Sequence, residues 1–155
     1  MGSRIEHSVQ VKCNPQRAWE IYSDWKRWRS WNGIYGDIRW VEGEPWVTGS
    51  RLEVDLLQPR PMTVKQVLTV CEPLHKVAWV GHGVGVTYEQ WVSFSPRRAG
   101  GTHVYVWIEL TGMATQFFGK TEVVRDTIVT WFEAFRAECD LGAATEAQRS
   151  ASAQP

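Results

Sequence analysis

The spacing of apolar residues along this chain changes once, and that change decides the fold class. From Tyr35 to Thr111 apolar and polar residues alternate in short runs interrupted by glycine and proline, which is typical of antiparallel strands joined by tight turns. From Thr115 to Cys139 apolar residues recur every three or four positions instead, which predicts one long amphipathic helix. The sheet has an apolar face that needs a cover, and this helix is the segment that can supply it.

Seven strands are expected. The first alternates over Arg4–Lys12 and carries four residues on one face, namely Ile5, His7, Val9 and Val11. The other six are predicted at Tyr35–Val41, Arg51–Gln58, Met62–Glu72, Lys76–Gly81, Val84–Ser95 and Thr102–Thr111. The glycines from Gly81 to Gly85 open a strand and not a helix, so they indicate a hairpin turn and not a phosphate-binding loop.

Three helices are expected. Asn14 is a favourable N-cap and Pro15 a favourable first residue, so one helix begins there. A second, short helix would carry three tryptophans on one face: Trp25, Trp28 and Trp31. The long helix is predicted to end near Gly142 as its C-cap, which leaves residues 1–141 as a single domain and residues 142–155 as a disordered tail.

Composition narrows the function classes. The 155 residues hold 17 Lys plus Arg and 17 Asp plus Glu, and a polyanion binder would carry a basic excess, so nucleic acid is not expected as a partner. No apolar run is long enough for a membrane segment and no signal peptide is apparent, which favours a cytoplasmic protein. Cys13, Cys71 and Cys139 are widely spaced and lack paired histidines, so no metal site and no cofactor are expected.

Aromatic residues are unusually abundant, with 10 Trp, 4 Tyr and 5 Phe. Such side chains suit the wall of an apolar pocket, and they serve equally well to fill a core. Both interpretations remain open for Trp25, Trp28 and Trp31, which either close the end of the sheet or cover a ligand.

Several short motifs resemble one known family. They are Asn14-Pro15-Gln16-Arg17-Ala18-Trp19, Ser23-Asp24-Trp25, Trp31-Asn32, Glu72-Pro73-Leu74 ahead of Val77-Ala78-Trp79, and Gly100-Gly101-Thr102. Together with the order of elements, these motifs resemble the START-related polyketide cyclase and dehydrase superfamily, SRPBCC, over residues 5–141. The resemblance implies an α+β helix-grip fold, in which a curved seven-stranded antiparallel sheet wraps around the long C-terminal helix.

The resemblance also implies an apolar cavity that binds a lipid, a polyketide or an aromatic compound. The candidate wall residues are Trp25, Trp28, Trp31, Trp79, Tyr88, Gln90, Phe117, Thr121, Val124, Arg125 and Ile128. Gln90 could orient a polar group of the ligand, and Arg125 could hold a carboxylate at the cavity mouth. His7 is the candidate catalytic acid or base, although a lone histidine among apolar residues is more often structural.

Three functions are therefore distinguished. The first is non-catalytic binding of a hydrophobic small molecule. The second is a polyketide cyclase or dehydratase that acts in the same cavity with His7 and a cavity Tyr or Gln. The third is a protein-binding module, like a co-chaperone, whose contact patch would be Trp40, Trp91 or Trp107 on the outer face of the sheet. The oligomeric state and the identity of the ligand are left open.

Overall fold

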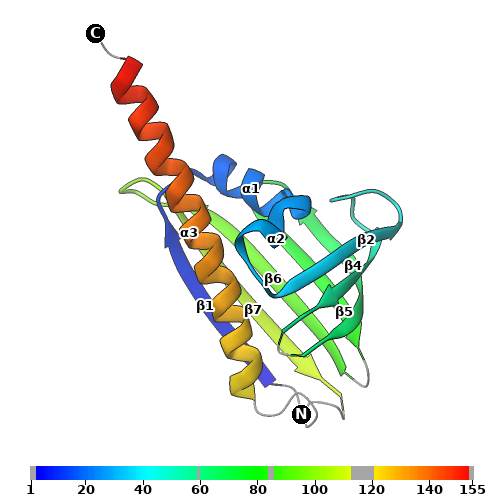
Figure 1. Cartoon of the computed structure of the whole chain (residues 1–155). Coiled ribbons are helices and arrows are strands. Elements are labelled where there is room, and N and C mark those ends of the chain that lie inside the picture. The colour runs from blue at the N-terminus through cyan, green and yellow to red at the C-terminus, as the bar shows by residue number, and fades with distance from the viewer. Residues whose placement is uncertain (1–2, 59, 84–85, 113–120, 154–155) are drawn as a thin grey trace.

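The computed structural model describes residues 3–58, 60–83, 86–112 and 121–153. Its seven strands form one antiparallel sheet in the order β1-β7-β6-β5-β4-β3-β2, with β1 and β2 at the edges. The strands are β1 (Ser3–Val11), β2 (Tyr35–Glu42), β3 (Arg51–Leu56), β4 (Met62–Glu72), β5 (Lys76–Gly83), β6 (Val86–Pro96) and β7 (Thr102–Thr111). The predicted α+β class and curved sheet are confirmed (Figure 1).

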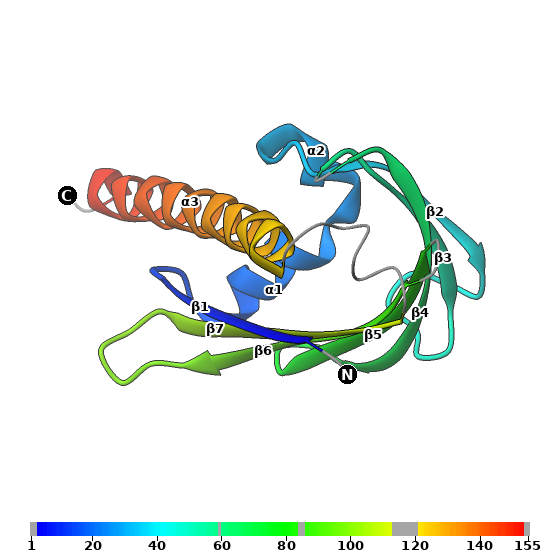
Figure 2. The ribbon, with the colours of Figure 1, turned by 90° about the horizontal axis from the view of Figure 1, so that it is seen from below.

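The helices are α1 (Pro15–Ser23), the 3-10 helix η1 (Trp25–Arg27), α2 (Trp28–Trp31) and α3 (Thr121–Ala153). Figure 2 shows the sheet curling around one side of α3, with α1 and α2 between the helix and the far end of the sheet. Asn14 caps α1 as predicted, because its side-chain oxygen accepts a hydrogen bond of 2.8 Å from the backbone N–H of Arg17. The predicted single helix across the tryptophans is instead split into η1 and α2.

The end of α3 differs from the prediction. The helix continues to Ala153, so the predicted C-cap at Gly142 is wrong and most of the segment 142–155 is helical. A glycine inside a helix costs only about 1 kcal/mol relative to alanine, and the residues that follow it are rich in Ala, Glu, Gln and Arg, which favour the helix. The predicted start at Thr115 falls outside the described residues.

Phe132 and Phe135 anchor α3 in the core, and both side chains are almost completely buried. The helix spacing is four residues from Ile128 to Phe132 and three from Phe132 to Phe135, which keeps all three side chains on one face of α3. On the sheet side, β6 and β7 supply the alternate residues Val92, Phe94, Val104 and Val106. This packing fixes the helix over β1, β7 and β6 and sets the depth of the space beneath it.

Candidate ligand cavity

A cavity of about 80 Å³ lies between α3 and the inner face of the sheet. One water needs roughly 10–15 Å³, and a cavity of about 150 Å³ binds benzene, so the space holds at most one small ring that extends toward the cavity opening. Its wall comes from β2 to β4, β6, β7 and α3, and is formed by Ile34, Tyr35, Leu56, Gln58, Val64, Val86, Tyr88, Gln90, Ile108, Leu110, Val124, Thr127, Ile128, Trp131 and Phe132. None of these side chains carries a charge at neutral pH.

Aromatic rings fill the other end of the space beneath α3. Tyr22 is 2% exposed, and its ring centroid lies 5.7 Å from Trp28 and 5.8 Å from Trp131. Two indoles are fixed by hydrogen bonds of 2.8 Å, since Trp28 donates to the carbonyl of Tyr22 and Trp46 to that of Ser23. The cavity is small because this aromatic cluster occupies most of the volume that the curved sheet encloses.

Five polar side chains interrupt the apolar wall, namely Tyr35, Gln58, Tyr88, Gln90 and Thr127. The hydroxyl of Tyr88 accepts a hydrogen bond from the side-chain amide of Gln66, and Tyr35 faces the same cavity from β2. Gln90 is only 8% exposed, yet its amide makes no hydrogen bond to any other described residue. Within the described part of the chain, the buried indole N–H groups of Trp131, which also lines the cavity, and of Trp40 lack a hydrogen-bond partner too, so Gln90 is one of several unpaired polar groups in the interior.

Burial keeps the tyrosines protonated. Desolvation raises the pKa of Tyr35 to about 12 and raises the pKa of Tyr22 and of Tyr88 well above the usual value. A phenol with a raised pKa donates hydrogen bonds across the physiological range and is not a source of negative charge. The hydroxyl of Tyr88 already accepts a bond from Gln66, so its own proton is available to donate.

Gly81 makes room for the Tyr88 ring. A Cβ atom at position 81 would lie 2.2 Å from Cζ of Tyr88, which is far inside van der Waals contact. We expect Gly81→Ala to push the ring off the sheet, to break the Gln66 bond and to lower the free energy of unfolding by about 1–3 kcal/mol. Urea denaturation followed by tryptophan fluorescence measures this loss.

Gly83→Ala is the matched control for Gly81→Ala, because Gly83 lies two residues further along β5. A Cβ atom there would meet the terminal methyl of Met62 at 2.8 Å, and that flexible side chain can move. Its expected effect is within about 0.5–1 kcal/mol. Equal effects of the two substitutions would show that Gly81 has no special role beneath Tyr88.

A recess of about 370 Å³ adjoins the cavity on the β2 and β3 side of α3. The two spaces share Ile34, Gln58 and Thr127, and the recess is completed by Val123, Asp126 and Thr130. Along α3, residues 123, 127 and 130 recur at helical spacing, so this face turns toward the recess while Val124, Ile128 and Trp131 face the cavity. Because the recess adjoins the cavity at these shared residues and is open to the surface, we refer to it as the mouth.

The structure brings four of the predicted wall residues together at the cavity, namely Tyr88, Gln90, Val124 and Ile128. Trp28 and Trp79 line an adjacent space of about 20 Å³ that shares Tyr35, Gln90 and Trp131 with the cavity. Trp31 packs at 5.2 Å from the ring of Trp131, as part of the aromatic cluster.

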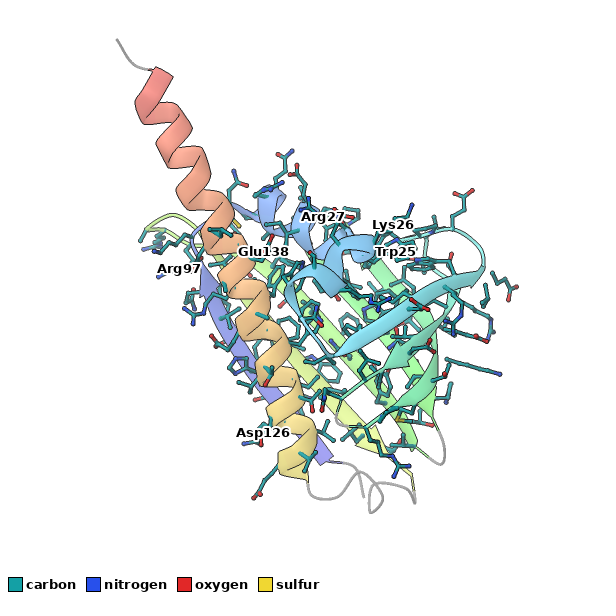
Figure 3. All side chains as sticks on the ribbon, viewed as in Figure 1. Trp25, Lys26, Arg27, Arg97, Asp126 and Glu138 are labelled. Carbon is teal, nitrogen blue, oxygen red and sulfur yellow. The ribbon has the colours of Figure 1, made fainter. Side chains whose placement is uncertain are left out.

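The remaining predicted wall residues lie elsewhere. Figure 3 places Trp25 beside Lys26 and Arg27 at the end of the molecule where α1 and α2 lie, and Trp25 lines a surface groove there. Arg125 is exposed and belongs neither to the cavity wall nor to the mouth. Thr121 is the first residue of α3, and Phe117 lies outside the described residues.

His7 lies between β1 and α3 and is not part of the cavity wall. Its Nε2 atom is 3.4 Å from a carboxylate oxygen of Glu133, and Glu133 is held by Arg136 at 2.6 Å. The strand face predicted for His7 is observed, but β1 is the edge strand beneath the helix, so that face meets α3 and not the cavity. This position fits a contact between the sheet and the helix.

Trp40 was predicted on the outer face, and that prediction is wrong. Its ring packs at 5.8 Å from Trp46 and 6.1 Å from Trp79, on the inner side of the sheet. Trp40 pairs with the buried Leu52, and it lies two residues from Ile38, so both face the inner side of the sheet. The pairing of β2 with β3 shifts between Tyr35 and Ile38, so this face differs from the one that alternation counted from Tyr35 would give. Trp91 and Trp107, which stack at 6.0 Å, share the outer face with Arg4.

Sequence reasoning missed Gln66, Tyr35 and the mouth residues Gln58 and Asp126. Gln66 carried a signal, because it alternates with Val64 and Leu68 on a buried face where a polar residue requires a reason. The mouth had no such signal, since it depends on where α3 lies relative to β3.

Within the described residues, no three His, Cys, Asp or Glu side chains gather as a metal site requires. In that same part of the chain, no helix combines the length and apolar character needed to cross a membrane.

Comparison with known proteins gives one family and a set of similar folds. Residues 3–144 match the family described as polyketide cyclase / dehydrase and lipid transport. No curated protein sequence matches the chain.

Three solved structures illustrate the likeness in fold. A hypothetical protein from Helicobacter pylori aligns with a TM-score of 0.77 at 10% identity, covering 88% of this chain and 88% of that one. The Zhui aromatase/cyclase from Streptomyces sp. R1128 aligns with a TM-score of 0.74 at 14% identity, covering 90% and 94%. Norcoclaurine synthase from Thalictrum flavum, in complex with dopamine and hydroxybenzaldehyde, aligns with a TM-score of 0.67 at 14% identity, covering 88% and 86%.

Proposed function

Because this chain belongs to the polyketide cyclase/dehydrase and lipid transport family, we propose that it binds a hydrophobic small molecule in the cavity beneath α3. The observation that carries the proposal is an uncharged, mostly apolar cavity that adjoins a surface recess, the mouth, at Ile34, Gln58 and Thr127. Ligand sites are typically apolar recesses with a few convergent polar groups, and here those groups include Tyr35, Tyr88 and Gln90.

The proposal is tested by native mass spectrometry of the freshly purified protein and by calorimetric titration with toluene, a neutral ring of suitable size. We expect either a co-purified hydrophobic compound or saturable binding of toluene with one molecule per chain. An apo mass together with no toluene binding would contradict the proposal and would mean that the interior is closed in solution.

Ring closure or dehydration in the same cavity is the second candidate, and the hydroxyl of Tyr88 is the observation that favours it. A protonated phenol held by Gln66 can donate a hydrogen bond to a ligand carbonyl and polarise it. This candidate requires the cavity wall to act without a charged base, so its chemistry would depend on holding the ligand in a reactive conformation.

His7→Ala separates a catalytic from a positioning role for the histidine. Because His7 contacts Glu133 and does not line the cavity, we expect toluene affinity and any turnover to stay within about twofold. We expect the free energy of unfolding to fall by up to about 1 kcal/mol through loss of the contact with α3. Abolished turnover with unchanged binding would restore His7 as the catalytic residue.

A further inference from the structure

The cavity wall offers several hydrogen-bond donors and has no charged residue among those described to balance an ion. Gln90 lies on β6 two residues after Tyr88, so both side chains face the cavity from the same side of the sheet. Tyr35 lines the same cavity from β2, which is an edge strand of the sheet. The amide of Gln90 and the two phenols form the polar part of the wall together with Gln58 and Thr127, which the cavity shares with the adjoining recess.

Gln90 has a hydrogen-bonding group that faces the cavity and that no described residue uses. Its side chain is more than nine-tenths buried and lines both the cavity and the smaller space next to it. Its amide has no hydrogen-bond partner among the described residues, whereas the neighbouring amide of Gln66 is bonded to Tyr88. Because Gln90 borders the cavity, an oxygen atom of a ligand bound there can accept the hydrogen bond that no described residue takes from this amide.

Charge limits the ligand further. No residue of the cavity wall among those described is acidic, basic or a histidine, so an ionised group would be desolvated without a counter-charge. Raised pKa values keep the tyrosines neutral donors. The wall therefore favours an uncharged oxygen acceptor over a carboxylate or an ammonium group.

We propose that Gln90 and Tyr88 recognise the hydroxyl or carbonyl oxygen of an uncharged, single-ring ligand whose apolar body lies against Val124 and Ile108. This inference rests on the proposed ligand-binding function and specifies its ligand class as neutral phenols and aryl ketones. The volume of about 80 Å³ sets the size, and the unbonded amide sets the polar group.

The experiment compares four probes of similar size by calorimetry or ligand-observed NMR, namely toluene, 4-methylphenol, benzoate and benzylamine. We expect 4-methylphenol to bind about tenfold more tightly than toluene, the gain of roughly one well-formed hydrogen bond. Benzoate and benzylamine should bind more weakly than 4-methylphenol at pH 7. Suppose that toluene binds, but that 4-methylphenol binds no more tightly than toluene or benzoate binds as tightly as 4-methylphenol. The inference is then overturned and the proposed function stands. If no probe binds, both are overturned.

Gln90→Leu gives a readout that a merely structural role would not give. Because the side chain of Gln90 has no hydrogen bond to another described residue to lose, the free energy of unfolding of the empty protein should stay equal or rise. The tenfold preference for 4-methylphenol over toluene should disappear, while toluene affinity persists. Tyr88→Phe should reduce the same preference about threefold to tenfold.

Gln10→Leu is the matched control, since Gln10 lies on the exposed face of β1 and contacts His103 there. This substitution should leave the affinities for toluene and 4-methylphenol unchanged, and therefore also their ratio. Retention of the preference in Gln90→Leu would overturn the inference, even where the variant folds and binds toluene normally.

Discussion

Replacing Phe135 by alanine is expected to destabilise the protein by about 3–5 kcal/mol, which is a large share of the stability of a single domain. The Phe135 side chain is fully buried and stacks on Trp131 at 5.7 Å. It also meets the rings of Tyr22 and Trp31 at 6.1 Å and 6.0 Å. Truncation would leave a void among large rings that cannot move together to fill it. Urea denaturation followed by fluorescence, with the midpoint and slope both fitted, measures the loss.

Val123→Ala is the control on the same helix, because Val123 is 41% exposed and its truncation should cost less than about 0.5 kcal/mol. A loss below about 1 kcal/mol for Phe135→Ala would contradict the packing described above. It would mean that the aromatic cluster rearranges around the missing ring, as a loosely packed interior can.

The half-buried strands could be predicted because one face of each strand is exposed to solvent and the other is buried in the core. In β7 the buried residues Val104, Val106, Ile108 and Leu110 alternate with more exposed ones, as the sequence pattern requires. The same alternation correctly grouped Tyr88 and Gln90 with Val92 on the inner face. Local periodicity carries this information, since each residue's face follows from its parity along the strand.

Trp40 and Gly142 mark where local patterns stop being informative. One pairing irregularity in β2, between Tyr35 and Ile38, changes the face on which Trp40 lies relative to Tyr35, and alternation counted from the start of the strand does not reveal it. Gly142 matches a C-cap, but whether a helix ends depends on the residues beyond it and on what they contact.

The cavity itself could not be located from the sequence, because its position depends on which aromatic side chains fill the enclosed volume. Trp28, Trp79 and Trp131 occupy one end and leave the other to smaller residues such as Val64, Val86 and Val124. His7 illustrates the same limit. Its strand face was predicted correctly, but only the placement of α3 over β1 decides that this face meets Glu133.

The size of the cavity makes it possible to close it with one side chain. Val124 lies on the face of α3 that lines the cavity, two turns before Trp131. We expect Val124→Trp to place an indole in the space of about 80 Å³ and to weaken toluene and 4-methylphenol binding by more than about a hundredfold, because ligand and indole would occupy the same volume. The free energy of unfolding should stay the same or rise by up to about 1 kcal/mol, since a filled cavity gains contacts.

Glu122→Trp adds the same side chain to α3 at an exposed position and should leave both affinities within about twofold. The combination of lost binding and retained stability in Val124→Trp would locate the ligand in the cavity, because a surface site elsewhere has no reason to respond to a buried residue. Unchanged binding in a stably folded Val124→Trp variant would place the ligand outside this cavity. In that case the mouth beside Asp126 and Thr130 would be the next volume large enough to hold a ring, because it offers about 370 Å³.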